Sequence, residues 1–480
     1  MTALLWFRRD LRLADHPALD AAVRAHEQVI PVFCFDDRLL AGRHASGPRT
    51  QFLLESLHDL DRGLRDRGAR LVVRRQRPEE GLVELAREAG ADEVYFSRDM
   101  TPFARSRGKS VHGALEAAGI AERAFPGLTV ADDVTGVRTK SGGGPYSVFS
   151  PFYKRWLDLP RRAVLAAPDE MSMPSGFTGK GRGSIPSLEE LGLRQEVTDP
   201  QPGGETEAAA RLAWFLDGPV HEYADLHDVP GVDGTSKLSA YLHFGCLSPR
   251  AIEAALAKGG GGNEVGGSEG AAAFHRQLCW RDFYHHVQYH YPETARTEFQ
   301  ERYRGGRLAW VTDEGRLSAW QQGKTGYPLV DAAMRQLLRE GWMHNRARLL
   351  AGSFLTKHLG IDWREGENWF MRMLLDGDQA NNNGNWQWIA SVGVDPQPVF
   401  RRLYNPALHQ KRYDPDGKYV CEYVPELRGV PEKYLTEPWT MPEAVQREAG
   451  CVIGKDYPKP IVDLPAAREA ALARYADAAG

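Results

Sequence analysis

Short apolar and β-branched runs alternate with amphipathic segments over the first 130 residues. The pattern predicts strands at residues 3–7, 29–35, 69–74 and 93–97. Between them, apolar residues recur at helical spacing, as in 52–64 and 82–86. Strand and helix in alternation predict a doubly wound parallel sheet, whose ligands lie at the carboxyl ends of the strands.

The pattern changes twice further along the chain. Pro and Gly interrupt both periodicities over residues 131–205, although the aromatic run PYSVFSPFYKRWLDLP inside this stretch is suited to pack on a neighbouring domain. Helical periods dominate from residue 206 onward. We therefore predict an α/β domain (1–130), an ordered interdomain linker (131–205) and a mainly α-helical domain (206–480).

Composition and charge narrow the class of protein. The 480 residues are 42% hydrophobic and 26% charged, as in an ordinary globular protein, and the formal net charge is -4. A nucleic-acid partner would therefore have to meet a local basic patch. The five cysteines form no CxxC pair, which indicates a reduced compartment and no metal site. No stretch has the ~18 to 20 apolar residues of a membrane span, so we expect a cytoplasmic protein.

The first strand is followed by FRRDLRL and not by a G-x-G-x-x-G motif. A site for a dinucleotide pyrophosphate is therefore not expected in this half. The cluster of Arg8, Arg9, Asp10 and Arg12 has two interpretations. It contacts a ligand at the strand ends, or it is a solvated loop of ion pairs.

Two segments of the helical half carry candidate chemistry. Thr235, Ser236 and Ser239 place hydroxyls where a helix starts, which suits a phosphate or a simple N-cap. The segment QLCWRDFY, residues 277–284, places an amide, an indole and a guanidinium along one side of a helix. That side suits an unstacked nucleobase and its phosphate, and a packed aromatic helix is the alternative.

The stretch from residue 341 to residue 388 combines five tryptophans with acids and amides, including Asp376, Asp378 and three successive asparagines. A packed core does not need such groups, because each buried amide or carboxylate must find partners. The ring nitrogens and carbonyls of a flavin require donors and acceptors of this kind. This stretch predicts a large, polar, aromatic ligand.

Taken together, these motifs resemble those of the photolyase and cryptochrome family, in the same order along almost the whole chain. The matching motifs are WFRRDLRLADHPAL, GTSKLSAYLHFGCLSPR, QLCWRDFYHH, WQQGKTGYPLVDAAMRQL, GWMHNRARL, DGDQANNNGNWQW and YNPALHQKRYDPDGKYV. Within the family, the chain looks most like the bacterial cyclobutane pyrimidine dimer photolyases. The resemblance implies an α/β antenna domain, a helical domain that holds FAD, and UV-damaged DNA as the partner. We expect a monomeric, light-driven lyase.

The resemblance also implies roles for single residues. Residues expected to hold the FAD phosphates and ribityl chain are Tyr223, Thr235, Ser236, Lys237, Leu238 and Ser239. Residues expected around its rings and adenine are Trp342, Asn345, Arg348, Asp376, Asp378 and Asn382. Asn382 falls where the family faces flavin N5, and an amide there favours repair over signalling.

Further roles concern electron flow and DNA. Trp386, Trp363 and Trp310 match a tryptophan chain that carries electrons to the flavin, and Trp280 and Trp388 match the pair that sandwiches a flipped dimer. The residues expected to act in catalysis are Gln277, Trp280, Asn345, Trp310, Trp363 and Trp386. The expected DNA contacts are Gln277, Trp280, Arg281, Arg346, Leu349, Trp388, Arg401 and Arg402, and the four arginines among them are expected to contact phosphates.

Two positions depart from the commonest dimer photolyases. Gln277 stands where they carry a glutamate, and Leu349 stands where they carry a methionine. A (6-4) photolyase would need paired histidines in this helix, whereas His344 is followed by Asn345. The cyclobutane dimer is therefore the preferred lesion. The alternatives are a (6-4) photolyase and a cryptochrome-type blue-light sensor, with an electron-transfer flavoprotein as a weaker possibility.

The resemblance also implies a second, antenna chromophore in the first domain. Relatives use methenyltetrahydrofolate or 8-hydroxy-deazaflavin. The acid and amide usual for folate are missing from the segment that contains Asp99 and Thr101, which favours the deazaflavin.

Overall fold

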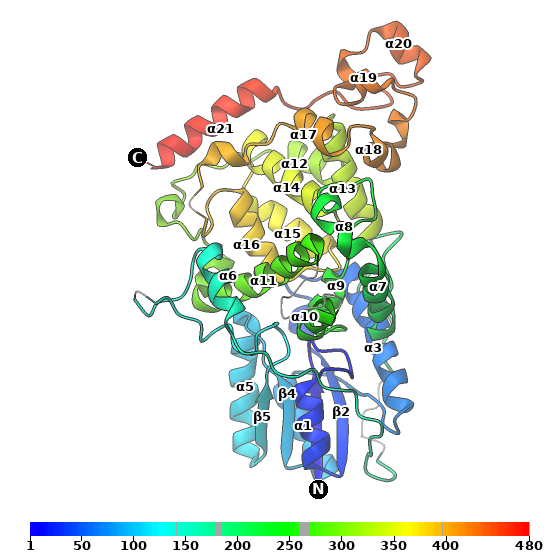
Figure 1. Cartoon of the computed structure of the whole chain (residues 1–480), viewed down its shortest axis with the longest axis vertical. Coiled ribbons are helices and arrows are strands. Elements are labelled where there is room, and N and C mark those ends of the chain that lie inside the picture. The colour runs from blue at the N-terminus through cyan, green and yellow to red at the C-terminus, as the bar shows by residue number, and fades with distance from the viewer. Residues whose placement is uncertain (141, 178–183, 259–267, 396, 480) are drawn as a thin grey trace.

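A five-stranded parallel sheet lies at the centre of the N-terminal part of the computed structural model (Figure 1). The structure describes residues 1–140, 142–177, 184–258, 268–395 and 397–479, so part of the predicted linker lies outside it. The strands are β1 (Thr2–Phe7), β2 (Gln28–Phe35), β3 (Val72–Arg75), β4 (Glu93–Ser97) and β5 (Ala121–Phe125). Their order is β3-β2-β1-β4-β5. The predicted α/β class is confirmed.

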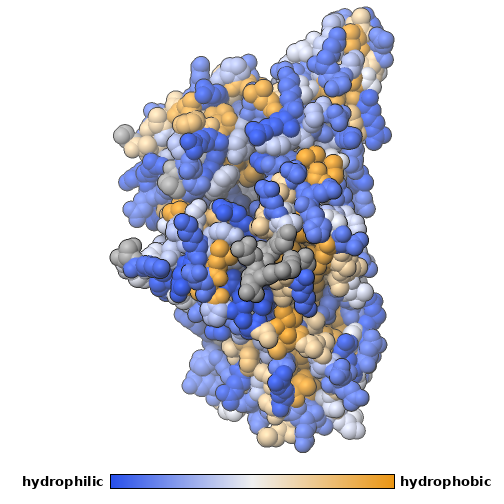
Figure 2. All heavy atoms as spheres, in the orientation of Figure 1, coloured by the Kyte–Doolittle hydropathy of each residue, from blue (hydrophilic) through white to orange (hydrophobic). Residues whose placement is uncertain are grey.

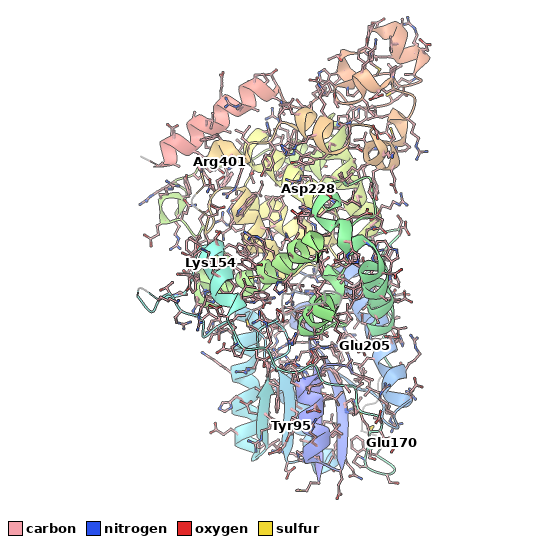
Figure 3. All side chains as sticks on the ribbon, in the orientation of Figure 1. Tyr95, Lys154, Glu170, Glu205, Asp228 and Arg401 are labelled. Carbon is pink, nitrogen blue, oxygen red and sulfur yellow. The ribbon has the colours of Figure 1, made fainter. Side chains whose placement is uncertain are left out.

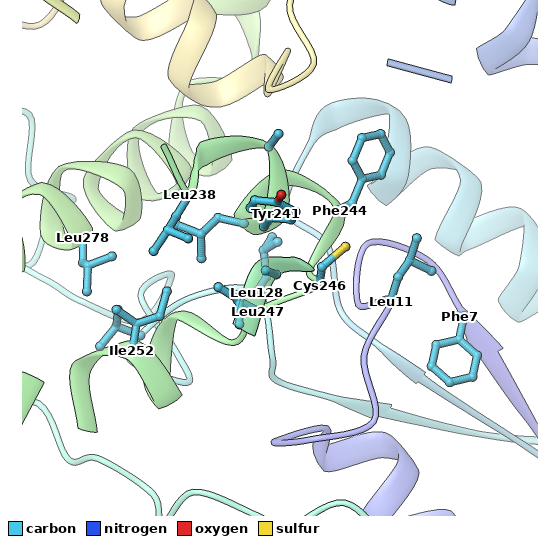
Figure 4. Packing of buried hydrophobic residues seen from close by; sticks show 14 of the residues in the cluster. Phe7, Leu11, Leu128, Leu238, Tyr241, Phe244, Cys246, Leu247, Ile252 and Leu278 are labelled. Carbon is cyan, nitrogen blue, oxygen red and sulfur yellow. The ribbon is translucent and has the colours of Figure 1, made fainter. Parts of the chain in front are cut away.

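The helices of this part are α1 (Pro17–Ala25), α2 (Asp37–Leu40), α3 (Gly47–Arg65), α4 (Pro78–Ala89) and α5 (Pro102–Ala118). Both faces of β1 are buried, as expected of a central parallel strand. Leu4 and Trp6 belong to the core that contains residues of α4 and α5. Leu5 and Phe7 belong to a larger core that continues into the helical part (Figure 4).

The strand predictions failed where apolar periodicity was weak. The third strand begins at Val72, three residues later than predicted, and β5 was missed entirely. All five residues of β5 are exposed or half-buried, because this strand pairs only with β4 at the sheet edge. Its sequence AERAF therefore lacks the apolar alternation that identifies an inner strand.

The aromatic run of the linker forms α6 (Phe149–Leu157), which lies beside α11. Phe149, Phe152 and Trp156 are buried in the core shared with α11, which confirms the expected packing on a neighbouring domain. Ring contacts join these helices, among them Phe149 to Trp280 and Phe152 to Phe283. The linker is thereby part of the packed structure.

The remaining elements build the helical part. Its first half contains α7 (Glu205–Asp217), α8 (Pro219–Leu226), α9 (Ser239–Phe244), α10 (Pro249–Lys258), α11 (Glu269–His290), η1 (Pro292–Ala295), η2 (Glu301–Tyr303), α12 (Glu314–Gln321), α13 (Pro328–Glu340), α14 (Asn345–Ser353) and the π-helix η3 (Phe354–His358). Its second half contains α15 (Trp363–Met373), α16 (Gln379–Ile389), η4 (Val399–Arg402), α17 (Pro406–Tyr413), α18 (Lys418–Tyr423), η5 (Pro425–Leu427), α19 (Glu432–Leu435), η6 (Pro438–Thr440), α20 (Glu443–Glu448) and α21 (Leu464–Ala479).

Charged residues that follow β1 join the two parts of the chain. Arg12 is 1% exposed, and its guanidinium donates to the carbonyl oxygens of Asp15 (3.0 Å), Gly127 (3.1 Å) and Gly245 (3.0 Å). Gly245 has φ +68°, and a Cβ there would fall 2.1 Å from the Arg9 carbonyl oxygen, so this approach requires glycine. Arg8, Asp10 and Arg12 are all buried, so the solvated-loop interpretation was wrong.

The outer surface is mainly polar. On the face shown in Figure 2, hydrophilic residues cover most of the surface and hydrophobic ones form small patches. Among the described helices, none is long and apolar enough to cross a membrane.

Candidate functional site

A cavity of about 480 Å³ opens among α8, α9, α11, α14, α15 and α16. Such a volume suits a ligand the size of a cofactor. All twelve residues predicted to hold a cofactor line it: Tyr223, Thr235, Ser236, Lys237, Leu238, Ser239, Trp342, Asn345, Arg348, Asp376, Asp378 and Asn382. The structure thus brings together residues that lie up to about 160 positions apart in the sequence.

One wall is the segment that leads into α9. Lys237 adopts φ +51°, and Arg211 fixes the segment by donating to the carbonyl oxygens of Thr235 (2.7 Å) and Ser236 (2.9 Å). The N-cap residue is Leu238, which forms no side-chain capping bond, so the interpretation of these hydroxyls as a simple N-cap was wrong. The buried Ser239 Oγ has no hydrogen-bond partner among the described residues. This wall therefore offers polar groups to a ligand.

Two aspartates on the opposite wall have different roles. Asp376 accepts two hydrogen bonds from Arg348, at 3.1 and 2.7 Å, and Arg348 also donates to the Met343 carbonyl oxygen. Asp378 caps α16 by accepting from the Asn381 amide at 2.9 Å and forms an ion pair with Arg9 of the N-terminal part. Both carboxylates are therefore fixed by partners before any ligand is considered.

Asn382 presents one end of its amide to the cavity. Its Nδ2 donates to the Glu367 carbonyl oxygen at 3.0 Å, which leaves Oδ1 for a ligand. The Glu367 side chain lies behind it, 1% exposed, and accepts from Asn383 at 3.1 Å. Burial raises the pKa of Glu367, which makes it a candidate proton store behind the cavity. Sequence analysis missed Glu367, although an acid four residues after Trp363 falls on the buried side of α15.

Two tryptophans on different helices line the same cavity. Trp280 of α11 stacks on Phe149 of α6, with ring centroids 3.6 Å apart and planes 3° apart. Trp388 of α16 donates from Nε1 to Asp395 at 2.9 Å, and the guanidinium carbon of Arg402 lies 3.9 Å from its ring centroid. Aromatic pairs contribute about 0.5–1.5 kcal/mol beyond their buried area. Phe149 thus packs against the Trp280 ring, and Arg402 packs against the Trp388 ring.

The remaining predicted tryptophans differ in their position relative to the cavity and to solvent. Trp386 lines the cavity and is 3% exposed, Trp363 is fully buried, and Trp310 is half-buried. Gly366, one turn after Trp363, lies against the Trp386 ring, where a Cβ would fall 2.1 Å from Cη2. Trp310 meets the Tyr475 ring edge-on at 6.4 Å. Trp386 thus borders the cavity, and Trp310 is the most exposed of the three rings.

The four arginines predicted to contact DNA phosphates separate into two groups. Arg402 is 2% exposed and is ion-paired with Asp395, so it cannot contact a phosphate on the surface. Arg281 lines the cavity and donates to the carbonyl oxygens of Leu128 and Leu242 (3.2 Å for the latter), which places it inside the protein. Burial contradicts the predicted phosphate contact of Arg402, whereas the DNA contact of Arg281 stays a prediction.

The other two arginines lie nearer to solvent. Arg346 is ion-paired with Asp228, and its guanidinium carbon lies 4.5 Å from the Tyr413 ring centroid. Arg401 is exposed and donates to Gln397 at 2.8 Å. Figure 3 labels Asp228 and Arg401 in the helical part, well apart from Tyr95 in the sheet.

A second cavity of about 270 Å³ lies where the N-terminal part meets the end of α11, and its lining includes Arg8, Asp99, Arg105 and Tyr289. Asp99 accepts from the Thr101 amide at 3.0 Å and lies 3.8 Å from Arg9. Thr101 caps α5 by accepting from Ala104. Because Arg9 also pairs with Asp378, one half-buried cation connects the walls of the two cavities.

The two positions that depart from the commonest dimer photolyases also line the first cavity. Gln277 is exposed and Leu349 is half-buried. His344 lies outside the lining, is 2% exposed and caps α14 by accepting from the Arg346 amide. Burial lowers the pKa of His344 to about 4, so its imidazole is neutral at pH 7.

Comparison with known proteins gives matches along the chain. Residues 274–477 match the model described as the FAD binding domain of DNA photolyase, and residues 3–171 match the DNA photolyase model. A deoxyribodipyrimidine photo-lyase of Streptomyces griseus is 40% identical, covering 97% of both chains.

Two solved structures have the same fold over the whole chain. A bacterial class III photolyase from Agrobacterium tumefaciens superposes with a TM-score of 0.90 at 36% identity, covering 99% of this chain and 97% of that one. A cryptochrome of Synechocystis superposes with a TM-score of 0.89 at 30% identity, covering 98% of both chains.

Proposed function

The chain belongs to the DNA photolyase family, and from this premise we propose that it is a light-driven DNA repair lyase that splits cyclobutane pyrimidine dimers. One observation carries the proposal. A single cavity holds all twelve residues expected to bind FAD together with Trp280, Trp388 and Gln277, the residues expected to meet the lesion. The cofactor and a pyrimidine dimer flipped out of the duplex would thus share one chamber.

The residues present fit FAD. The unpartnered Ser239 Oγ and the segment held by Arg211 offer hydrogen-bond groups for phosphates and ribityl hydroxyls, and the Asn382 amide oxygen faces the cavity. Bound reduced FAD supplies, on absorbing light, the electron that opens the cyclobutane ring. Asn382 places a neutral group beside the flavin, and Asp376 holds Arg348 in position.

The lesion reaches this cavity only when it leaves the duplex. Flipping costs a few kcal/mol, and less for a base that is already poorly paired. Trp280 and Trp388 provide planar surfaces for the extruded bases, and the exposed Gln277 amide can bind a base edge. Leu349 keeps the wall apolar at a volume similar to that of methionine.

The DNA backbone would contact the rim of this cavity. Arg401 is the exposed member of the four predicted arginines, and Arg346 lies close to the surface in its pair with Asp228. Phe400 beside Arg401 is 59% exposed, so an apolar ring is available to occupy the space left by the extruded bases. With a net charge of -4, binding would rest on such local contacts and fall with salt.

The cyclobutane dimer is preferred over the (6-4) photoproduct because His344 is buried, neutral and outside the lining of the cavity. A (6-4) photolyase relies on histidine as a proton donor at the lesion. A cryptochrome-type sensor remains the alternative, since the Synechocystis structure has the same fold. The Asn382 amide favours repair.

We further propose that the second cavity holds an antenna chromophore, and that 8-hydroxy-deazaflavin suits it better than methenyltetrahydrofolate. The acid and amide usual for folate are absent from the wall that contains Asp99. The absorption spectrum of the native protein distinguishes the two pigments. The domain limits at residues 130 and 205, the monomeric state and the cytoplasmic location stay predictions.

The direct test is a repair assay under blue light with fully reduced protein. Oligonucleotides that carry a single cyclobutane dimer or a single (6-4) photoproduct are assayed separately, with dark reactions as controls. We expect light-dependent repair of the dimer alone. Repair of only the (6-4) lesion would reverse the choice of lesion, and repair of neither would move the protein to the sensory alternative.

A further inference from the structure

Trp388 is held at its edge and over its face by two residues that follow it in the chain. Its Nε1 donates to Asp395 Oδ2 at 2.9 Å, and Arg402 forms an ion pair with the same oxygen. The Arg402 guanidinium carbon lies 3.9 Å from the Trp388 ring centroid. One carboxylate therefore holds both the indole and the cation that lies over it.

The backbone around these two residues is itself anchored. The carbonyl oxygen of Arg402 accepts from Ser353 of α14 at 2.7 Å. On the other side, the Gln300 amide donates to the carbonyl oxygen of Gly393 at 2.9 Å, two residues before Asp395. The arginine is 2% exposed, and among the described residues Trp388 lines the cavity while Arg402 does not. The cation thus lies on the side of the ring away from the cavity.

We propose that Asp395 and Arg402 are positioning residues that fix the Trp388 ring in the orientation that receives an unstacked pyrimidine. This inference rests on the proposed function and assigns to Arg402 a role in place of a phosphate contact. An indole turns about two side-chain bonds, and a hydrogen bond at its edge together with a planar cation behind its face restricts both. A ring ordered in advance loses less freedom when the base binds.

The cation also changes the open face of the ring. A positive charge behind an aromatic ring reduces the negative potential on its opposite face. That face then repels the carbonyl oxygens of a pyrimidine less. Trp280 on the other wall is backed by the neutral ring of Phe149, so the two surfaces differ in electrostatic character.

The test is a double-mutant cycle on binding in the dark. Fluorescence anisotropy gives the Kd for an oligonucleotide with one cyclobutane dimer and for the undamaged oligonucleotide, with the parent, R402M, W388A and the double variant. We expect R402M to weaken binding of the damaged oligonucleotide about tenfold, with little change for the undamaged one. In the W388A background, R402M should add no further loss, because Arg402 acts through that ring.

Matched variants distinguish a positioning role of Arg402 and Asp395 from a general effect of their loss on folding. Arg161 has a similar arrangement outside the cavity, with its guanidinium carbon 4.4 Å from the Trp156 ring centroid and an ion pair to Glu253. R161M should leave the discrimination between the two oligonucleotides unchanged. D395N, which keeps an oxygen for the indole N–H, should lose less affinity than D395A. Flavin absorption and the Tm verify folding, and R402K replaces R402M in the cycle if the latter does not retain flavin.

The possible outcomes separate the two proposals. Additive losses in R402M and W388A, in a parent that discriminates between the oligonucleotides, would overturn this inference alone. Equal affinity of the parent for both oligonucleotides would overturn the proposed function and this inference with it. Loss of the damaged-DNA preference in R402M but not in R161M, with no further loss in the double variant, supports the positioning role.

Discussion

Trp386 and Trp388 stand two residues apart on α16 and line the same cavity, yet their surroundings differ in kind. Trp386 is 3% exposed and lies among aromatic rings, with Phe370 at 4.9 Å and Trp320 at 6.2 Å between centroids. Trp388 is half-buried and lies between the cavity and the ion pair of Asp395 and Arg402. One indole has an apolar environment, and the other has a charged one.

Helix geometry produces this difference. Two residues correspond to about 200° around a helix, so the two side chains leave α16 in nearly opposite directions. Trp386 therefore meets α12 and α15, whereas Trp388 meets the chain that follows α16. We propose electron transfer for Trp386 and stacking of a base for Trp388. The residue type is the same at both positions, so only the tertiary neighbours distinguish the two roles.

The largest expected effect is on photoreduction of the flavin, which should depend on Trp386 and not on Trp388. Trp386→Phe should abolish photoreduction of the bound flavin, because the ring next to the cavity is the last step of the proposed electron path from the surface. Trp388→Phe is the matched control and should keep photoreduction. Absorption spectra recorded under blue light with an external reductant measure both. Equal loss in the two variants would remove the distinction in electron supply.

The second effect separates them by DNA binding. Trp388→Ala should raise the Kd for dimer-containing DNA about 10- to 100-fold, since stacking of a base on an aromatic ring contributes about 1–3 kcal/mol. Trp386→Phe should leave that Kd unchanged. Anisotropy titrations in the dark give both values. If the Trp386 variant binds as weakly as the Trp388 variant, the electron path and the lesion surface are not separate.

A smaller effect tests whether the electron path extends from Trp386 to Trp310. Trp310→Phe should slow photoreduction while sparing repair by chemically reduced enzyme, because Trp310 is the half-buried end of the path. Trp320→Phe should change photoreduction less, since Trp320 is fully buried and donates to the Ala351 carbonyl oxygen at 3.1 Å as a packing residue. A loss in the Trp320 variant equal to that in the Trp310 variant would show a branched path.

The smallest effect concerns the opposite wall. Gln277→Glu should keep dimer repair or raise it by no more than about threefold, because one neutral hydrogen bond is exchanged for a charged one. It should leave photoreduction unchanged, since Gln277 is exposed at the cavity and is not one of the tryptophans proposed to carry electrons. Single-turnover repair assays measure the first quantity. A large loss of repair would mean that the amide itself is required.

Sequence reasoning predicted the residues that line the cavity better than the residues that pack behind them. Asn382, Arg348 and Trp388 lie in contiguous motifs, so their spacing could be interpreted before the fold was known. Phe149 could not be paired with Trp280, because 131 positions separate them and only tertiary packing brings them together. Arg402 was mistaken for a surface residue because its sequence does not show burial.

The sheet shows the same limit. The inner strands β1, β2 and β4 were predicted to within one residue because burial on both faces gives them continuous apolar runs. The edge strand β5 has no such run, and its backbone pairing with β4 cannot be inferred from side-chain pattern. A strand of this sheet is therefore predictable from the sequence when its side chains are buried on both faces.

The three carbonyl oxygens bound by Arg12 have a consequence for the order of folding during synthesis. They belong to Asp15, Gly127 and Gly245, so the last of them leaves the ribosome long after the strands of the sheet have been made. Until then, the buried cation lacks one of its three acceptors, and an incompletely paired buried charge is costly. The hydrogen bonds of Arg12 are therefore complete only after the chain has grown beyond residue 245, which couples the final packing at the end of β1 to the helical part.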